Sequence, residues 1–340
     1  MEINHLQIIN YKSLKDFMIV SPNAFSVFVG PNAAGKSNIF EALEFLSFCS
    51  FMNAYEAFKL FGNLNDLLNK KITEKYSHFS FDIFFYKENI RPYLVIEVVK
   101  DFSGNYIPSK YDAADFEFNM LNSEKDSMSE NKSIRHFFNF SRIFISNSNL
   151  LKRPIQDDSK LALDASNLEK VLKRLLKNER TKAEIIEWLQ LLIPGFDKVE
   201  IVSEPLSGSD NLLIYEKGTI KPFNKSLISD GTYNVLAILT AVFQSDEPQF
   251  LCIEEPENGL NPKVIKELVS LFRQKCNEGH FIWLNTHSQT LVSELTSDEI
   301  ILVDKKNGET VIKQIKGMNL HGLKMDEALL TNALGGGIPW

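Results

Sequence analysis

The stretch VGPNAAGKSN, residues 29–38, decides the fold. It satisfies the pattern G-x-x-x-x-G-K-[ST], with an apolar run before it and a segment of helical apolar spacing that begins at Lys36. In such a loop the backbone N–H groups point at phosphate, the lysine reaches the terminal phosphates, and the serine hydroxyl can bind Mg²⁺. We therefore predict a nucleotide-phosphate site formed by Gly30, Pro31, Asn32, Ala33, Ala34, Gly35, Lys36, Ser37 and Asn38.

Composition narrows the class of protein around this loop. The chain has 340 residues, is 44% hydrophobic and contains 26 Phe, which is ample for a buried core. No apolar run approaches the roughly 18 residues of a membrane span, and the N-terminus lacks a secretory signal, so we expect a cytoplasmic protein without a membrane partner. The net charge of −7 argues against a chain that coats nucleic acid. Three separated cysteines indicate neither a disulfide framework nor a zinc site.

The order of apolar runs predicts an α/β architecture. In the second half, the runs LLIYEKG, QFLCIEE, HFIWLN and EIILVD alternate with helical patterns at about 231–245 and 262–277. Near-continuous apolar strands between helices indicate a central, mostly parallel sheet that is covered on both faces. HFSFDIFFYK and RPYLVIEVVKD predict two antiparallel strands, and a helical block is expected from Ser166 to Leu192.

A second acidic site follows one of these strands. FLCIEEPENGLNP places Glu254 and Glu255 at the C-terminal end of a strand, where ligands bind in open α/β sheets. With Mg²⁺ already implied, we assign Glu254 to the metal, together with Ser37, and Glu255 to the attacking water. The alternative is a solvated acidic turn that caps the helix near Pro262.

Together these motifs resemble the ABC-type ATPase heads of the SMC, RecF and OLD group. The matching segments are LQIINYKSLKD, GPNAAGKSN, SDGTYNVLAIL, IEEPENGLNP and LNTHS, in that family's order. The resemblance implies an ABC-type P-loop NTPase head that binds ATP and Mg²⁺ and forms a head-to-head homodimer around two nucleotides. It implies that His287 contacts the γ-phosphate and, with lower specificity, that Lys12 and Ser13 contact nucleotide. It also implies a signature that reaches the partner's nucleotide, formed by Ser229, Asp230, Gly231 and Thr232.

The resemblance also divides the chain. We expect one ABC-type ATPase domain over 1–340, with the lobe that carries the phosphate loop (Walker A) in 1–70 and 225–310. An antiparallel β part is expected at 75–118, a polar loop and helical insertion at 119–220, and a C-terminal tail at 311–340. The departures favour the RecF and OLD branch over transport ATPases: SDGT replaces the longer LSGGQ-type signature, and Glu254 stands where transport ATPases usually have Asp. No heptad array and no TOPRIM nuclease segment is visible, which resembles stand-alone phage-defence ATPases.

Two features lie outside the nucleotide motifs. SNLEKVLKRLLKNERTK predicts an amphipathic helix with a capping box of Ser166 and Glu169. One of its faces carries a basic stripe formed by Lys170, Lys173, Arg174 and Lys177. The stripe is a solvated exterior, a phosphate-contacting face or a protein-docking face. The ending ALGGGIPW is either a floppy tail or, by resemblance, the end of a stand-alone ATPase that works with a separate partner.

These observations support three hypotheses. The first is an Mg²⁺-dependent ATPase switch whose dimer, or a higher oligomer built from it, controls a separate effector such as a TOPRIM-like nuclease or toxin in anti-phage defence. The second is a RecF-like DNA repair ATPase, and the third is a scaffold that uses ATP as glue with slow turnover. We rank the first highest and expect DNA binding by the chain alone to be weak.

Overall fold

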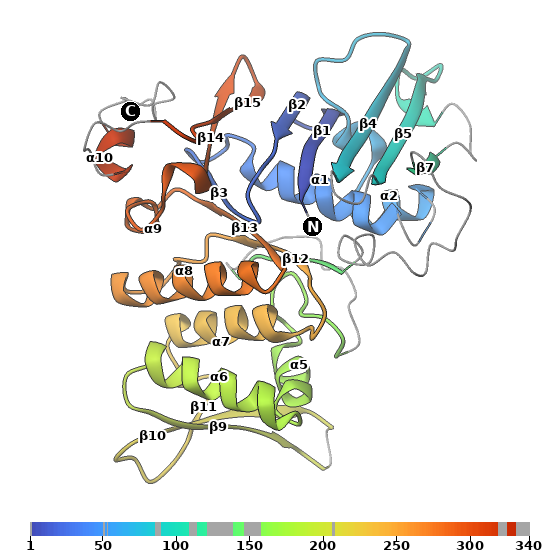
Figure 1. Ribbon diagram of the computed structural model, residues 1–340. Coiled ribbons are helices and arrows are strands. Elements are labelled where there is room, and N and C mark those ends of the chain that lie inside the picture. The colour runs from blue at the N-terminus through green and yellow to red at the C-terminus, as the bar shows by residue number, and fades with distance from the viewer. Residues whose placement is uncertain are drawn as a thin grey trace.

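A central six-stranded sheet organises the molecule (Figure 1). The computed structural model describes residues 2–49, 52, 54–85, 90–108, 114–120, 139–145, 158–205, 208–318 and 325–330, so the polar loop from residue 121 and the final ten residues lie outside it. Five strands are parallel in the order β14 (Ile300–Lys306), β3 (Phe25–Val29), β13 (Phe281–Thr286), β12 (Phe250–Glu254) and β8 (Phe140–Ile143). β15 (Glu309–Gln314) adds an antiparallel edge. The predicted mostly parallel sheet is therefore confirmed.

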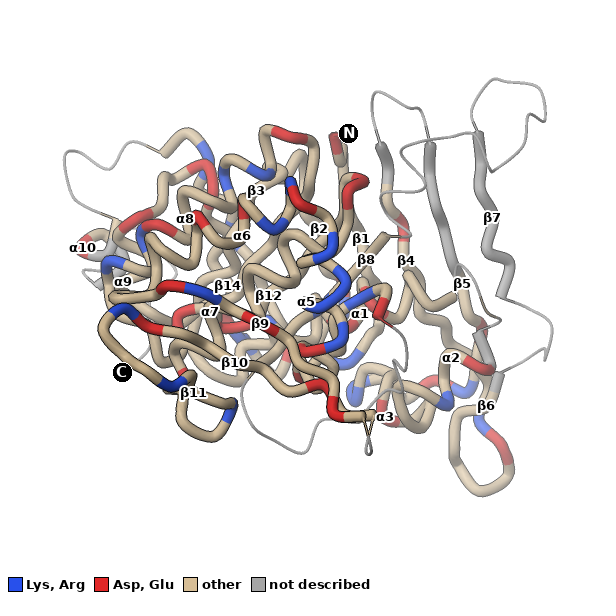
Figure 2. Tube along the Cα trace, turned by 90° about the horizontal axis from the view of Figure 1, so that it is seen from below, with Lys and Arg blue, Asp and Glu red and all other residues tan. Residues whose placement is uncertain are grey.

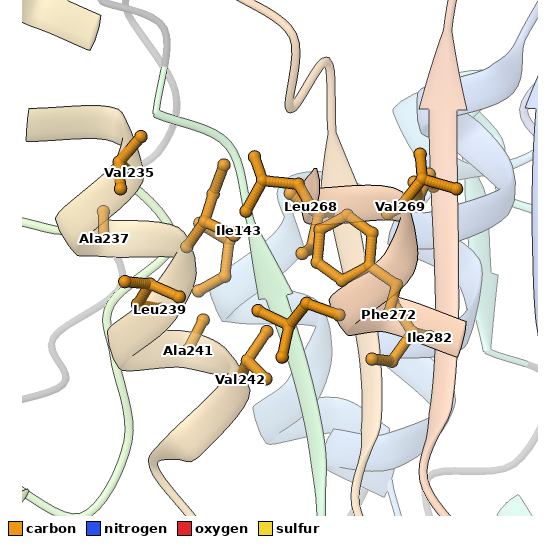
Figure 3. Close-up of a cluster of buried hydrophobic side chains, with 14 of the residues drawn as sticks. Ile143, Val235, Ala237, Leu239, Ala241, Val242, Leu268, Val269, Phe272 and Ile282 are labelled. Atoms are coloured by element: carbon orange, nitrogen blue, oxygen red, sulfur yellow. The ribbon is translucent and has the colours of Figure 1, made fainter. Parts of the chain in front are cut away.

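The two faces of this sheet belong to different hydrophobic cores, because successive strand residues point to opposite sides. One core is mainly aliphatic and contains α5 (Leu168–Leu175), α6 (Glu179–Leu192), α7 (Asp230–Phe243) and α8 (Pro262–Asn277). Figure 3 shows α7 and α8 side chains packed with Ile143 and Ile282 from the sheet. None of the helices in the described ranges has the length and apolar composition that a bilayer span needs.

The opposite face is rich in aromatic side chains. Trp283 lies with its ring centroid 4.8 Å from that of Phe250 and 5.3 Å from that of Phe28. Helix α1 (Lys36–Cys49) packs in this core, followed by α2 (Ala54–Phe61) and α3 (Leu64–Leu67). α1 begins at Lys36, as the sequence predicts.

A second, antiparallel sheet covers the far side of the aromatic core. Its strands are β1 (Ile3–Tyr11), β2 (Leu14–Val20), β4 (Tyr76–Phe85), β5 (Ile90–Lys100), β6 (Tyr106–Pro108) and β7 (Ala114–Met120). The predicted antiparallel pairing of β4 with β5 is confirmed. We assigned β1 and β2 to the phosphate-loop lobe. In the structure β2 pairs with β1 and β1 pairs with β4, so both strands lie in this sheet. Likewise β8, expected in the insertion, is an edge strand of the central sheet.

A small lobe forms the remaining layer. β9 (Phe196–Ser203), β10 (Asp210–Glu216) and β11 (Phe223–Asn224) make a separate antiparallel sheet next to α5 and α6 (Figure 1). The predicted strand LLIYEKG is therefore not part of the central sheet: only Leu212 and Ile214 of β10 are buried, which suits a sheet with one covered face. The other helical segments in the described residues of the C-terminal part are α9 (Gln289–Val292), the 3₁₀ turn Ser297–Glu299 and α10 (Met325–Leu330).

The helical block at 166–192 is two helices, which corrects the single run that we expected. α5 ends at Leu175, and Asn178 caps α6 by accepting from the N–H groups of Arg180 and Thr181. The predicted capping box is also wrong, because Asn167 is the N-cap residue of α5 and makes no side-chain cap hydrogen bond. The Asn167 amide oxygen instead accepts from Ala162 N at 2.7 Å, and Glu169 of the predicted box pairs with Lys225 at 2.8 Å.

Candidate nucleotide site

The phosphate loop leads from β3 into α1 at the carboxyl end of the sheet. Gly35 has φ of +101°, and a Cβ there would lie 1.9 Å from Thr310 Oγ1, so only glycine fits. The Lys36 ammonium donates to the carbonyls of Gly30 and Pro31 at 2.8 and 2.9 Å. Burial lowers the pKa of Lys36, and the carboxylates of Glu255, Glu257 and Glu254 offset this only in part. A buried cation is therefore held at the centre of the loop.

Glu254 ends β12 and points at this loop. Ser37 Oγ donates to its Oε2, and Asn285 Nδ2 from β13 donates to the same oxygen at 3.0 Å. One carboxylate oxygen is thus shared by a hydroxyl and an amide. Asn285 lies beside Glu254 because the two strands are paired in parallel register at these residues.

Arg142 on β8 is a site residue that the sequence analysis missed. Its Nε donates to Glu254 Oε1 at 2.6 Å and its Nη1 pairs with Glu44 Oε2 at 3.1 Å, with only 4% of the arginine side chain exposed. Burial alone would lower the pKa of Arg142, but Glu254 and Glu44 raise it above the ordinary arginine value. This buried cation joins α1, β8 and β12 directly behind the site.

The oxygen atoms next to the loop fit an Mg²⁺ ion. The Ser37 hydroxyl and the Glu254 carboxylate are within hydrogen-bond distance of each other, and both are hard oxygen donors of the kind that Mg²⁺ takes. Such sites typically use one or two protein ligands and fill the rest with water and phosphate oxygens. In the described part of the chain, no cluster of three or more His, Cys, Asp or Glu residues could hold a metal. Ser37 and Glu254 therefore remain the candidate ligands.

Glu255 and His287 form a pair at the sheet edge. His287 Nδ1 lies 3.2 Å from Glu255 Oε1, and both side chains are partly exposed. Glu255 leaves the strand with φ of +47°, and its N–H donates to the Asn285 carbonyl at 3.0 Å. Because of this φ angle, the Glu255 side chain does not follow the alternating side-chain directions of β12. Glu255, which we assigned to the attacking water, and His287, which we expect at the γ-phosphate, are thus adjacent in space although 32 positions separate them in the chain.

Glu257 lies behind this pair. Its Oε1 accepts from the Thr286 hydroxyl, and Thr286 Oγ1 in turn accepts from Ser288 N at 2.9 Å. Burial raises the pKa of Glu257, while the Thr286 hydrogen bond acts in the opposite direction. Since Thr286 and Ser288 flank His287, Glu257 holds the segment that carries the histidine. In the sequence, this bracing role of Glu257 is indicated only by its position in PEN, residues 256–258, inside the acidic motif.

Ser229 caps the signature helix in this structure. Its Oγ accepts from Thr232 N at 3.1 Å at the start of α7, as a helix cap does, and Asp230 follows in the first turn. Ser229 and Asp230 are exposed. The four predicted signature residues therefore form one accessible helix start, and their contact with a second nucleotide remains a prediction.

Lys12 and Ser13 lie beside the loop in different roles. Lys12 pairs with Glu41 at 2.5 Å. Ser13 Oγ lies 2.6 Å from Thr310 Oγ1 and accepts from Asn38 Nδ2 at 2.7 Å, so it braces the phosphate loop from outside. Their contact with nucleotide stays a prediction.

The basic stripe is not a continuous free surface. Lys173 pairs with Asp210 at 2.7 Å, and Arg174 donates to the carbonyls of Asp158 and Gln244, each at 2.7 Å. Lys170 and Lys177 are exposed, but Lys177 lies beyond the end of α5. Figure 2 shows basic and acidic segments interspersed around α5, β9 and β10. The structure therefore brings the nucleotide motifs together and separates the four basic residues.

Comparisons with known proteins identify the family and the fold of the chain. The family model described as "AAA domain, putative AbiEii toxin, Type IV TA system" matches residues 25–293, which include the phosphate loop, both acidic residues and His287. The chain belongs to this AAA domain family. Its fold is that of ABC-type ATPase heads: the crystal structure of an SmcHead bound to the C-winged helix domain of ScpA superposes with a TM-score of 0.61 at 15% identity, covering 95% of this chain and 100% of the other. The Smc head of Pyrococcus furiosus gives 0.55 at 17% identity, covering 98% and 99%.

Curated relatives match over shorter stretches. The energy-coupling factor transporter ATP-binding protein EcfA2 of Lactobacillus acidophilus is 32% identical over 82 residues, 23% of this chain and 29% of that protein. The L-cystine import ATP-binding protein TcyC of Bacillus subtilis is 25% identical over 118 residues, 35% of this chain and 44% of that protein. The chain thus spans less than half the length of these relatives, whose printed names describe ATP-binding proteins.

Proposed function

We propose that this protein is an Mg²⁺-dependent ATPase switch that dimerises around ATP and controls a separate effector in prokaryotic anti-phage defence. One observation carries the proposal: Lys36, Ser37 and Glu254 meet the Glu255–His287 pair at the carboxyl edge of one sheet. A cation for phosphates, oxygens for a metal and a carboxylate with a histidine are the parts that phosphoryl transfer to water requires. The curated relatives with ATP-binding names support ATP as the nucleotide.

Each residue has a defined task in this proposal. Lys36 neutralises the β- and γ-phosphates, and the loop N–H groups orient them. Ser37 and Glu254 would hold Mg²⁺, which would neutralise part of the phosphate charge. Glu255 accepts a proton from the attacking water while His287 orients that water against the γ-phosphate. Arg142 fixes Glu254 in position, because its guanidinium pairs with the oxygen that Ser37 does not use.

Glu255→Gln tests hydrolysis. We expect turnover to fall by a factor of about 100 or more while ATP affinity is retained, so that an ATP-bound dimer accumulates. The matched control is Glu187→Gln on the exposed side of α6, which should leave turnover unchanged. Hydrolysis near the parent rate in the Glu255 variant would remove this residue from catalysis. A parent chain with ATP-dependent dimers and negligible turnover would favour the ATP-glue hypothesis.

Ser229→Arg tests the dimer. The exposed start of α7 is proposed to meet the nucleotide of a second chain, and a bulky cation there should block that approach. We expect ATP binding by the monomer to persist and ATP-dependent dimers to disappear in sedimentation with a non-hydrolysable analogue. Dimers of normal stability would show that SDGT is only a helix cap.

The proposed switch acts on a separate effector protein. The family description names a toxin and a TA system, which supports a role beside a second component. Affinity purification of the chain with ATP or ADP should recover a neighbouring gene product in one nucleotide state only. Recovery of DNA with nanomolar affinity and no protein partner would favour the RecF-like alternative.

A further inference from the structure

The Glu255 carboxylate is held from two sides. Its Oε1 lies 3.2 Å from His287 Nδ1, and its Oε2 accepts from Asn258 Nδ2 at 3.1 Å. Asn258 belongs to the turn that follows Glu255, and its N–H also donates to the Glu255 carbonyl at 3.2 Å. Since the Glu255 side chain is partly exposed and can rotate, these two contacts define where the carboxylate points.

The turn that carries Asn258 is itself anchored to the signature helix. Asn234 on α7 donates through Nδ2 to the Asn258 carbonyl at 2.6 Å. One turn earlier, a Cβ on Gly231 would lie only 2.4 Å from the Gly259 carbonyl oxygen. Gly259 has φ of +72°, a conformation that favours glycine. The start of α7 and this turn are therefore in backbone contact without space for an added methyl group.

We propose that Asn258 is a positioning residue for Glu255, and that Asn234 ties the turn carrying Asn258 to the signature helix of the same chain. The inference rests on the proposed catalytic role of Glu255. A base must lie within hydrogen-bond reach of the proton it accepts, and a shift of about 1 Å can reduce the rate by a factor of 10². A displacement of the start of α7 would therefore shift Asn258 through Asn234, and with it the Glu255 carboxylate of the same chain.

The first experiment compares Asn258→Ala with Asn258→Asp. The alanine variant loses the amide donor, and we expect kcat to fall by about tenfold with KM and ATP affinity within twofold of the parent. The aspartate variant has nearly the same shape but places a like charge against Glu255, so its kcat should be lower than that of the alanine variant. A merely structural role predicts the reverse order, with the isosteric aspartate milder, and that result would overturn the proposal.

The second experiment measures Asn258→Ala in the Glu255→Gln background. If Asn258 acts through Glu255, the double variant should lose less than twofold beyond Glu255→Gln alone, and an additive tenfold loss would contradict the proposal. Asn234→Ala should lower kcat severalfold in the parent and also be nearly silent in this background. Asn211→Ala, an exposed amide on β10, is the control, and thermal unfolding checks each fold.

The outcomes separate the two proposals. Parental turnover in Glu255→Gln alone would reject the catalytic role of Glu255 and this inference with it. Loss of turnover in Glu255→Gln together with normal kcat in both Asn258 variants would reject only the positioning role.

Discussion

The nucleotide site and helix α5 both contain several charged side chains, but these side chains have different partners in the structure. In the site, Lys36, Glu254 and Arg142 come from separate elements and meet where parallel strands end. In α5, Lys173 and Arg174 bind acidic or carbonyl partners in neighbouring segments. Motifs that follow parallel strands meet at one sheet edge, because the sheet topology brings the carboxyl ends together. No such topology keeps the basic residues of one helix together as a free surface. Nearby acceptors bind Lys173 and Arg174, and only Lys170 and Lys177 are left exposed.

Removal of Arg142 should have the largest effect on the site side of this comparison. Arg142→Ala leaves Glu254 and Glu44 buried without their cation, so we expect a loss of about 3–5 kcal/mol in the free energy of unfolding. Urea unfolding of the variant measures this. Lys177→Ala, at an exposed lysine, should change the same quantity by less than about 0.5 kcal/mol. Equal losses in the two variants would remove the distinction between the regions.

A methyl group at the start of α7 should have the next largest effect. Gly231→Ala places a Cβ 2.4 Å from the Gly259 carbonyl oxygen, and the overpacking should cost about 1–3 kcal/mol of folding stability. Gly104→Ala is a useful comparison, because a Cβ there meets nothing within 4 Å and only its φ of +82° opposes the change. Thermal unfolding should place the Gly231 variant below the Gly104 variant, and the opposite order would contradict the close packing.

Lys36→Ala should weaken nucleotide binding without unfolding the chain. We expect ATP affinity to fall at least tenfold, about 1.4 kcal/mol, because the phosphates lose their buried cation. Calorimetric titration measures the affinity, and Lys170→Ala on α5 is the matched lysine control. Unchanged affinity in the Lys36 variant would reject the phosphate-loop assignment.

Charge reversal on α5 should have the smallest effect. Reversal of the exposed Lys170 and Lys177 should alter folding stability by no more than about 0.5 kcal/mol. We expect DNA binding by the parent chain to be micromolar or weaker, as for non-specific contacts. Binding assays over a salt series test this. If nanomolar binding is found and is lost when all four basic residues are reversed, the repair function becomes the better hypothesis.

Local patterns in the sequence predicted the local structure around the candidate site. The phosphate loop, the start of α1 at Lys36 and the bounds of α8 follow from spacing, glycines and Pro262, and the structure contains each of them. The Glu255–His287 contact was not itself predicted: Glu255 was assigned from its place after a strand, and His287 by resemblance. The parallel pairing of β12 with β13 explains physically why the two residues meet. These features depend on short stretches or on a topology that alternating strands and helices imply.

Long-range pairing explains what the sequence could not predict. Arg142 meets Glu44 and Glu254 across 98 and 112 residues. Nothing in the segment RIFIS, residues 142–146, which the sequence indicates as a strand, points to a buried ion pair. The membership of β1 and β2 in the antiparallel sheet depends on pairing with β4, about 70 residues later in the chain. The predicted capping box is absent: Asn167 is the N-cap residue in place of Ser166, and Glu169 pairs with Lys225, 56 residues later in the chain.

The backbone of Glu255 shows how this site balances two demands. A non-glycine residue at φ of +47° pays a conformational cost of about 1–2 kcal/mol, which glycine would avoid. The reversal also turns the residue out of the strand, toward His287 and Asn258. Glycine would relax the main chain there but would remove the carboxylate. A chain with glycine at this position would have the less strained backbone, but only the chain with glutamate has a carboxylate there. The sequence contains the glutamate and therefore keeps the strained backbone.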